Sequence, residues 1–429
     1  MSFSPIPINE GVKYTHVYTE RGKTDSLCVS FRIPLDERNL ASITLVSKIL
    51  LRGTRSFPNT LSICREGEDN YGASIDIAFQ KRGKELALVF MLSYMRNRFA
   101  FEGEDIAERA VKLFSEFIFE PYLKDGAFDQ DYTEREKVAL CAQIASLKNN
   151  KPAYAAYRAA QLMCAGEPAA VSIYNCADLV RSLTPAELTT FFEKTVKSAP
   201  VDIVYAGNAD KDRILELIER HLPFEPRAGI RRSAVRRRVP KKVRAFTEEA
   251  EASQSTLVMG FRLGGDIERR HYNDFLLFGA ILSLSPVSKL FMNVREKLSL
   301  CYYCSGIPDR HNKVIYISAG IDAENSEKVQ KEILKQIDDI ARRRISETEY
   351  NNALSYCVSA LRSQSDDVSS LCSYYLSHVW RGVYRTLDEE CEKLKKTSVD
   401  GAVEIAANAV LDTVYLLKGS IDANNRKAL

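Results

Sequence analysis

The chain has 429 residues, of which 45% are hydrophobic and 27% are charged, as in a globular protein long enough for two or three domains. Its 60 basic and 57 acidic residues give a formal net charge of +3, which excludes a protein that binds nucleic acid through its overall charge. The first 20 residues contain Pro5 and Pro7 but no apolar signal core, and no apolar run approaches the roughly 20 residues that span a bilayer. We therefore expect a cytoplasmic protein without a membrane span.

The first half of the chain alternates predicted strands with helices. Apolar and alternating residues predict strands at 27–33 and 87–92. A long amphipathic helix is predicted to begin at Thr133, because a Ser or Thr followed by acidic residues suits a helix N-terminus. An apolar strand at 201–206 closes this half on Gly207.

A proline-containing basic segment, 223–245, follows the first half. Its basic residues between 227 and 244 are accompanied by no aromatic side chain on which a nucleic-acid base could stack. We interpret it as a solvated linker and expect no nucleic-acid partner. The predicted domains are therefore 1–222 and 246–429.

The second half repeats the pattern of the first. Strands are predicted at 256–263 and 314–321, a helix opens at Ser346 with acidic residues after it, and an apolar strand closes on Gly419. A repeated order of similar elements indicates an internal duplication. Strands and long helices in separate blocks favour an α+β fold made of two homologous halves.

Cysteine and histidine provide no evident metal site. The ten cysteines have no repeated spacing, and a long chain without an export signal is expected to keep them reduced. Cys301 and Cys304 form a C-x-x-C pair, which could be half of a zinc knuckle or a redox couple, but its alternating context favours a structural role in a strand. None of the five histidines has another four residues away, the spacing that places two imidazoles on one helix face.

Several short motifs, in order along nearly the whole chain, resemble the M16 family of zinc peptidases, which includes the pitrilysin and mitochondrial-processing enzymes. The resemblance is strongest to its non-catalytic YfmF-like branch. The motifs are the helix exit Leu50-Leu51-Arg52-Gly53-Thr54 with Pro58, the turn Tyr71-Gly72-Ala73-Ser74, the helix with Glu136, Ser288-Lys289-Leu290-Phe291, Arg295-Glu296-Lys297 and Leu300-Cys301-Tyr302. The resemblance implies two α/β-sandwich halves in a clam-like arrangement, each with an antiparallel-rich sheet covered by helices, as in LuxS/metallohydrolase-like proteins.

The resemblance also implies that the zinc chemistry is lost. The family's helix carries His-x-x-Glu-His, with two metal ligands and the carboxylate that activates water. The corresponding positions here are Thr44, Ser47 and Lys48, and the family's third ligand, a glutamate, corresponds to Gln143. A neutral amide cannot balance a dication as a carboxylate does. We expect no catalytic residue, no metal ligand and no cofactor.

The resemblance implies that residues able to hold a peptide are kept in this chain. Arg295 and Tyr302, seven residues apart, match an arginine and a tyrosine that reach the bound peptide in active relatives. The family's first edge strand pairs with substrate through its backbone, but its usual Asn-Ala step is Ile75-Asp76 here. The implied partners are a peptide and a second M16 subunit with an intact His-x-x-Glu-His motif. A homodimer is expected if the chain is isolated.

Three functions remain open from the sequence. The first is a non-catalytic subunit that binds peptide and completes the chamber of an active zinc-peptidase partner. The second is an active metallopeptidase with a non-standard metal site, which would need zinc and converging ligands. The third is a purely structural or peptide-binding module. Substituting Arg295 or Tyr302 would slow a partner's peptidase only under the first.

Overall fold

The computed structural model describes residues 4–101, 103–229, 241–264 and 272–420. Its contacts divide the chain into two compact units. Unit 1 comprises Met1–Ala145, Ser172–Ala234 and Arg362–Thr386, and unit 2 comprises Ser146–Val171, Val235–Leu361 and Leu387–Leu429. Among the described residues, no helix combines the length and the apolar character needed to cross a membrane.

Unit 1 is built on a six-stranded sheet in the order β1-β2-β8-β3-β5-β4. All neighbouring strands are antiparallel except β2 and β8, which run parallel. The central strand β8 is buried along its whole length, as a strand covered on both faces must be. The strands are β1 Ile6–Asn9, β2 Val12–Tyr18, β3 Thr24–Pro34, β4 Ser74–Arg82, β5 Glu85–Met95 and β8 Val201–Gly207.

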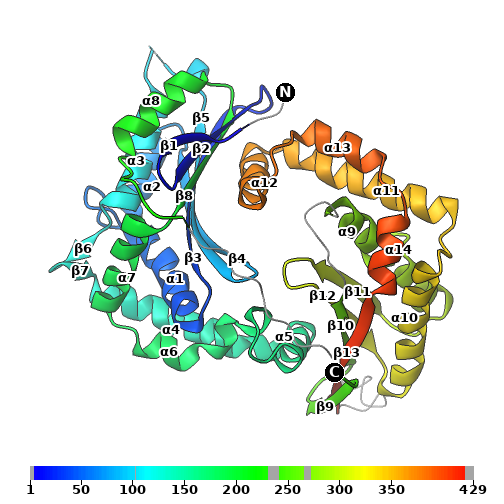
Figure 1. The fold of residues 1–429 in the computed structure, drawn as a ribbon. Helices are drawn as coiled ribbons and strands as arrows, with labels where there is room; N and C mark the ends of the chain where they lie inside the picture. Colours follow the sequence, from blue (N-terminus) through cyan, green and yellow to red (C-terminus); the bar gives the residue numbers. More distant parts are fainter. Residues whose placement is uncertain (1–3, 102, 230–240, 265–271, 421–429) are drawn as a thin grey trace. The chain divides into compact units, whose positions relative to one another are not determined.

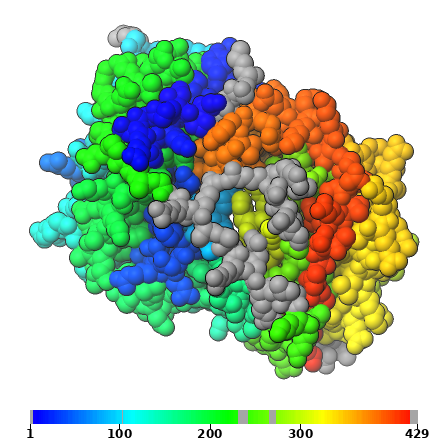
Figure 2. Space-filling view, in the orientation of Figure 1, coloured from blue at the N-terminus to red at the C-terminus, as the bar shows by residue number. Residues whose placement is uncertain are grey.

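Helices cover both faces of this sheet (Figure 1). Helices α1, α3 and α7 pack on one face, and α12, Val368–Arg381, packs against β3 and β8 on the other. Figure 2 shows the dark-blue residues of β1 and β2 at the surface of unit 1, beside the green residues of α8. The remaining helices of this unit are α1 Glu37–Ile49, α2 Thr60–Asp69, α3 Ile106–Phe119, α4 Gln130–Ser146, α6 Ala177–Ser182, α7 Pro185–Ser198 and α8 Lys211–His221, with the short hairpin β6 Leu123–Lys124 and β7 Ala127–Phe128.

The long helix expected at Thr133 begins three residues earlier, at Gln130. The Asp129 carboxylate accepts a hydrogen bond from the Tyr132 N–H at 3.0 Å and so caps the helix. The Thr133 hydroxyl instead donates to the Asp129 carbonyl at 2.8 Å. The sequence expectation missed the start because either residue type can cap a helix.

Unit 2 repeats the strand arrangement of unit 1. Its sheet has the order β11-β12-β10-β13-β9, in which only β13 and β9 are parallel. This order corresponds to β4-β5-β3-β8-β2 in unit 1. The α+β fold with two related halves is thus confirmed. The strands are β9 Arg244–Ala250, β10 Ser255–Leu263, β11 Tyr303–Asp309, β12 Val314–Ile321 and β13 Ala409–Gly419.

The helices of unit 2 also lie on two faces. Helix α5, Lys151–Met163, packs against β10 and β13, and α9, α10 and α14 lie on the opposite side of the sheet (Figure 1). Two π-helical turns, η7 and η8, lead into β11. The bounds are η7 Ala280–Leu284, η8 Leu290–Lys297, α9 Tyr272–Gly279, α10 Ser326–Ala341, α11 Glu347–Arg362, α13 Leu387–Lys395 and α14 Asp400–Ala407.

One helix of each half packs with the sheet of the other half. Helix α5 precedes the linker in sequence but belongs to unit 2, and α12 follows the linker but belongs to unit 1. The predicted boundaries 1–222 and 246–429 therefore describe the order of the duplicated segments along the chain. They do not describe which helix covers which sheet.

Two arginines fasten α5 to the sheet of unit 2. Arg262 donates to the Met163 carbonyl at 2.8 Å, and Arg244 donates to the Leu162 and Met163 carbonyls at 2.9 and 3.1 Å. Both arginines also bind Asp412, whose side chain has no exposed surface. Cations at the last carbonyls of a helix satisfy its free acceptors and oppose its dipole.

The expectation that the basic segment is solvated is wrong at its two ends, Arg227 and Arg244. Arg244 begins β9 and is held as described, and Arg227 is only 6% exposed. The Arg227 guanidinium donates to the Glu225, Val196 and Ala199 carbonyls. Composition alone could not separate these anchoring arginines from solvated ones. The remaining arginines of the run, Arg231–Arg238, lie outside the described residues.

Candidate functional site

Helix α1 carries the first three positions at which the family has its zinc chemistry. The Thr44 hydroxyl donates to the Leu40 carbonyl at 2.6 Å, and the Ser47 hydroxyl donates to the Thr44 carbonyl at 3.0 Å. Both side chains are 5% exposed. Their protons are therefore used within the helix itself, a common arrangement for hydroxyls in helices. Lys48 lies in the last turn of α1, where a cation is favourable to the helix dipole but repels a metal ion.

The fourth position lies on α4. Gln143 is exposed, and its side chain carries no charge. Glu136, one of the residues that carried the resemblance, is 4% exposed and is bound by Arg52, whose Nε donates to it at 2.7 Å. The Glu136 carboxylate, two turns before Gln143, is thus already paired with an arginine. Two internally bonded hydroxyls, a lysine and an amide do not fit a zinc ion.

The exit of α1 explains why its motif survives without zinc. A Cβ atom at Gly53 would lie 2.8 Å from the backbone carbonyl of Pro58, so only glycine fits there. The Thr54 hydroxyl donates to Glu116 of α3 at 2.8 Å. Together with the pair of Arg52 and Glu136, these contacts join α1 to α3 and α4. The motif therefore has a packing role that does not depend on a metal.

The histidines are dispersed over the described part of the chain. His16 binds the Tyr14 hydroxyl at 2.7 Å and stacks on Tyr205, and burial lowers the pKa of His16. His221 contacts Glu108 at 2.5 Å, and His378 contacts the Tyr374 carbonyl at 2.9 Å. His271 lies outside the described residues. Within the residues that the structure describes, no three His, Cys, Asp or Glu side chains gather as a metal site would require.

Strand β4 forms one edge of the sheet of unit 1. It follows a turn in which Tyr71 and Gly72 both have positive φ angles, of 56° and 77°. Tyr71 tolerates this conformation with its hydroxyl bound to Glu104 at 2.8 Å. Within the described structure β4 pairs only with β5, so its other side presents backbone N–H and C=O groups. Such an edge can pair with an extended peptide.

A cavity of about 390 Å³ adjoins this edge within unit 1. Asp76, Ala78 and Gln80, alternate residues of β4, share its lining with two residues of β5 and with the start of α12. Two carboxylates, Asp76 and Asp367, line it and no basic residue does. The full lining is Asp76, Ala78, Gln80, Val89, Met91, Gln364, Asp367, Ser369, Ser370 and Ser373. We call this the β4 cavity.

The β4 cavity could not be predicted from the sequence. Its serines and Asp367 lie almost 300 residues from β4 along the chain. They reach it only because α12 packs on the sheet of unit 1. Asp367 also caps α12, since its carboxylate accepts from the Ser370 N–H at 2.7 Å.

Arg295 and Tyr302 both lie at the entry to β11, the edge strand of unit 2. Arg295 is in the last turn of η8, with its guanidinium 4.8 Å from the centre of the Phe291 ring and 3.5 Å from Glu296. Tyr302 is 45% exposed, and its N–H donates to the Gly320 carbonyl at 2.8 Å, next to the first pair of β11 with β12. The two residues are therefore fixed through their backbones while their side chains reach solvent.

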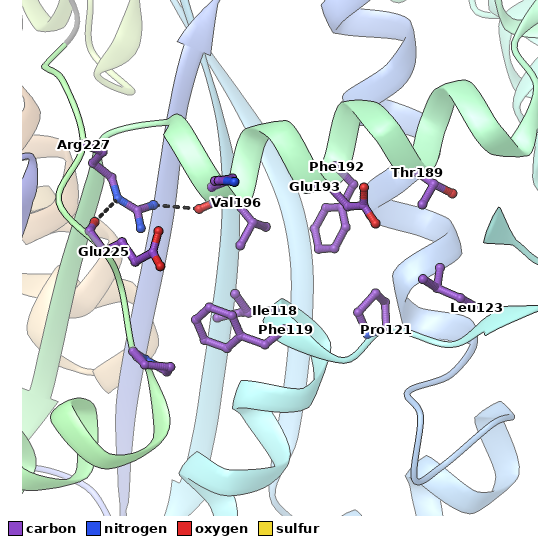
Figure 3. A pocket seen from close by; sticks show the side chains of 12 residues that line it. Ile118, Phe119, Pro121, Leu123, Thr189, Phe192, Glu193, Val196, Glu225 and Arg227 are labelled. Atoms are coloured by element: carbon purple, nitrogen blue, oxygen red, sulfur yellow. Dashed lines mark hydrogen bonds between the residues drawn. The ribbon is translucent and has the colours of Figure 1, made fainter. Parts of the chain in front are cut away.

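Unit 1 contains a second cavity of about 390 Å³, on the side of α7 and the end of α3. Figure 3 shows Phe192 of α7 and Phe119 of α3 on opposite walls, with Arg227 bound to the backbone at one end. Glu193, Lys197 and Glu225 also line it, so its polar groups have both signs. This lining selects no ligand charge, and we assign no ligand to it.

Comparison with known proteins gives related sequences and folds. The family described as "Peptidase M16 inactive domain" matches residues 182–356. The "probable inactive metalloprotease YmfF" of Bacillus subtilis (strain 168) is 24% identical over 411 residues, covering 95% of this chain and 96% of its own. The branch that the sequence resembles is therefore that of YmfF and not YfmF.

Two solved structures share the fold over nearly the whole chain. A conserved protein from Enterococcus faecalis V583 has a TM-score of 0.87 at 23% identity, covering 98% of this chain and 100% of its own. A peptidase M16 inactive domain from Pseudomonas fluorescens has a TM-score of 0.77 at 17% identity, with 98% and 99% covered. Over nearly its whole length the chain is therefore similar in sequence to YmfF, a probable inactive metalloprotease, and it shares its fold with an M16 peptidase inactive domain.

Proposed function

We propose that this chain is a non-catalytic subunit that binds an extended peptide and completes the chamber of an active M16 zinc-peptidase partner. The observation that carries the proposal is the contrast within unit 1. The zinc positions on α1 hold hydroxyls bonded within their own helix, while β4 keeps an open edge with a cavity beside it. The site thus lacks the chemistry of peptide hydrolysis and keeps groups that can bind a peptide.

In this proposal the peptide adds a strand to β4. Backbone hydrogen bonds would supply affinity without regard to side-chain identity, and alternate side chains would face the β4 cavity. Asp76 and Asp367 would then favour a lysine or arginine side chain. The division of labour leaves zinc, base and water to the partner.

Arg295 and Tyr302 would act on the substrate bound to the partner. A guanidinium offers a planar set of donors that stays charged, and a tyrosine hydroxyl can donate to a developing oxyanion. Both side chains are exposed at the start of β11, as such a role needs. Their contribution is electrostatic positioning of a carbonyl, which needs no metal in this chain.

The test is a reconstituted peptidase assay with a partner subunit that has an intact His-x-x-Glu-His motif. We expect Arg295→Ala and Tyr302→Phe each to lower the partner's rate at least about tenfold, because one oxyanion donor contributes on the order of 10²-fold or more. Assembly, measured by light scattering, should not change. Arg342→Ala, which removes an exposed arginine paired with Asp338 on α10, is the matched control. Full activity in both test variants would favour the structural module instead.

Metal content separates this proposal from an active metallopeptidase. We expect the purified chain, dialysed without chelator, to contain far less than one zinc per chain by inductively coupled plasma mass spectrometry. Near-stoichiometric zinc, together with peptide hydrolysis by the chain alone, would overturn the proposal. The same preparation, analysed by light scattering, tests the expected homodimer, and cell fractionation tests the expected cytoplasmic location.

A further inference from the structure

Two cysteine thiols flank Tyr302 at the entry to β11. Cys301 and Cys304 are both free and are 8% and 6% exposed. The chain bends at Tyr302 before it enters the strand, so the two side chains do not alternate as they would in a straight strand. The Cys304 thiol donates a hydrogen bond to the Cys301 sulfur. Cys304 lies in β11, as strand alternation predicts, whereas Cys301 lies before the strand.

The surroundings make the two thiols unequal. The hydrogen bond from Cys304 lowers the pKa of Cys301, and the Arg295 guanidinium lowers it further against the opposing effect of burial. The same hydrogen bond and burial raise the pKa of Cys304 well above its usual range. The Cys301 thiol therefore ionises more readily and is the nucleophile of the pair, while the Cys304 thiol stays protonated.

We propose that Cys301 and Cys304 form a peroxide-responsive dithiol, in which Cys301 attacks the peroxide and Cys304 resolves the product as a disulfide. This inference does not rest on the peptide-binding function, although it uses Arg295 a second time. It assigns chemistry to the C-x-x-C motif, which that function does not use.

The reaction balances with a hydroperoxide as the oxidant. The Cys301 thiolate attacks one peroxide oxygen, the O–O bond breaks, and the leaving oxygen departs as water or an alcohol after taking a proton. The Cys301 sulfenic acid then condenses with the Cys304 thiol, so that an S–S bond forms, the S–O bond breaks and water leaves. The two thiols together give two electrons, which reduce the peroxide. A reducing thiol restores the pair through exchange with the disulfide.

The structure contains a natural control pair. Cys28 of β3 and Cys372 of α12 are also hydrogen-bonded to each other and have no exposed surface. Contact with Cys372 and burial raise the pKa of Cys28, and the Cys372 thiol donates to the Val204 carbonyl at 3.1 Å. Proximity is therefore common to the two pairs. Of the two, only the pair of Cys301 and Cys304 has a nearby guanidinium and a small residual exposure, of 8% and 6%. Cys64 is exposed and serves as a marker of unselective oxidation.

The test is a titration of the whole reduced protein with hydrogen peroxide, followed by alkylation of remaining thiols and peptide mass spectrometry. We expect a disulfide between Cys301 and Cys304 to form at least about tenfold faster than one between Cys28 and Cys372, since thiolate fraction and access set the rate. Arg295→Gln should slow it and Arg295→Lys should largely restore it. In Cys304→Ser, a sulfenic acid reagent such as dimedone should label Cys301.

Three outcomes would overturn the proposal. One is that the thiols of Cys301 and Cys304 stay reduced at a peroxide dose that already oxidises Cys64. Another is that Cys28 and Cys372 are oxidised as fast. The third is that Cys304→Ser leaves Cys301 unlabelled while near-ultraviolet circular dichroism shows the variant folded.

Discussion

At the scale of single residues, a network of hydrogen bonds in unit 1 holds the buried charges of Arg96 and Asp25. Arg96 is 1% exposed, and its Nε donates to Asp25 at 2.8 Å. Its other nitrogens donate to the Thr19, Glu20 and Arg21 carbonyls, and the Tyr205 hydroxyl donates to Asp25 at 2.6 Å. This network joins the segment after β2 to β3, β5 and β8. Removing one member leaves the others buried without partners.

Replacing Arg96 with alanine should strongly destabilise unit 1. The Asp25 carboxylate would remain buried without its cation, which typically costs about 3–5 kcal/mol. Trp380, the one tryptophan of the chain, lies on α12 in unit 1, so its fluorescence during urea unfolding reports on this unit. Arg181→Ala is the control, because its pair with Asp178 is exposed and contributes at most about 1 kcal/mol. Equal urea midpoints for the two variants would contradict the expectation.

At the scale of elements, the candidate binding groups lie beside the edge strands and not on helix α1. Strands β4 and β11 occupy corresponding edges of the two sheets. Beside β4, the start of α12 contributes Asp367 and three serines to the β4 cavity, and before β11 stand Arg295 and Tyr302. Within the described residues, candidate binding groups therefore gather at the edge of each sheet and not at Thr44, Ser47, Lys48 and Gln143.

A peptide bound along β4 should reveal the charge of the β4 cavity. We expect a peptide with a central lysine to bind more tightly than the same peptide with glutamine, by up to about fivefold, the usual range for partly exposed ion pairs. Asp76→Asn should remove this preference without weakening the glutamine peptide. Asp367→Asn should reduce it as well while preserving the cap of α12, because asparagine caps helices as well as aspartate does.

Binding by isothermal titration calorimetry would measure both peptides on each variant. Asp131→Asn, an exposed aspartate of α4 outside the cavity lining, controls for overall charge. If wild-type protein binds the two peptides equally, the cavity does not select a cation. If neither peptide binds, β4 is not the binding edge.

The sequence predicted these elements unevenly, for physical reasons. Apolar alternation identified β3, β5, β10 and β12, because each strand's own residues carry that signal. The π-helical turn that carries Arg295 packs against β11 and α10, and the bend at Tyr302 is bonded to Gly320 of β12; neither feature had a local sequence signal. The substituted zinc positions were visible from the motif alone, but that the Thr44 and Ser47 hydroxyls bond within α1 needed coordinates. Coordinates were also needed to place Asp367 beside β4, because it reaches that strand only through the packing of α12.

At the scale of the whole molecule, the duplication and the packing follow different boundaries. An amphipathic pattern shows that a helix has a buried face, but it does not show which sheet covers that face. Helix α12 buries ten of its 14 residues in unit 1, and α5 is fastened to unit 2 by Arg244 and Arg262. Each unit thus includes a helix from the other half of the sequence. Neither half of the chain contains a complete unit.

Cutting the gene between the halves should therefore give two incomplete proteins. A fragment of residues 1–229 lacks α12, which leaves one face of β3 and β8 uncovered, and a fragment of 241–429 lacks α5, which leaves β10 and β13 uncovered. Uncovered apolar sheet faces favour association or loss of fixed packing. We expect each fragment alone to aggregate or to bind a hydrophobic dye, and the two co-expressed to copurify in equal amounts.

The control is the full chain with a protease site inserted between 230 and 240, cut after folding, which should retain the near-ultraviolet circular dichroism of the intact protein. A 1–229 fragment that is monomeric, with native near-ultraviolet signal and no dye binding, would show that α12 is dispensable for unit 1. The packing of α12 on β3 and β8 argues against that result, because the apolar side chains of β3 and β8 that α12 covers would be exposed to water.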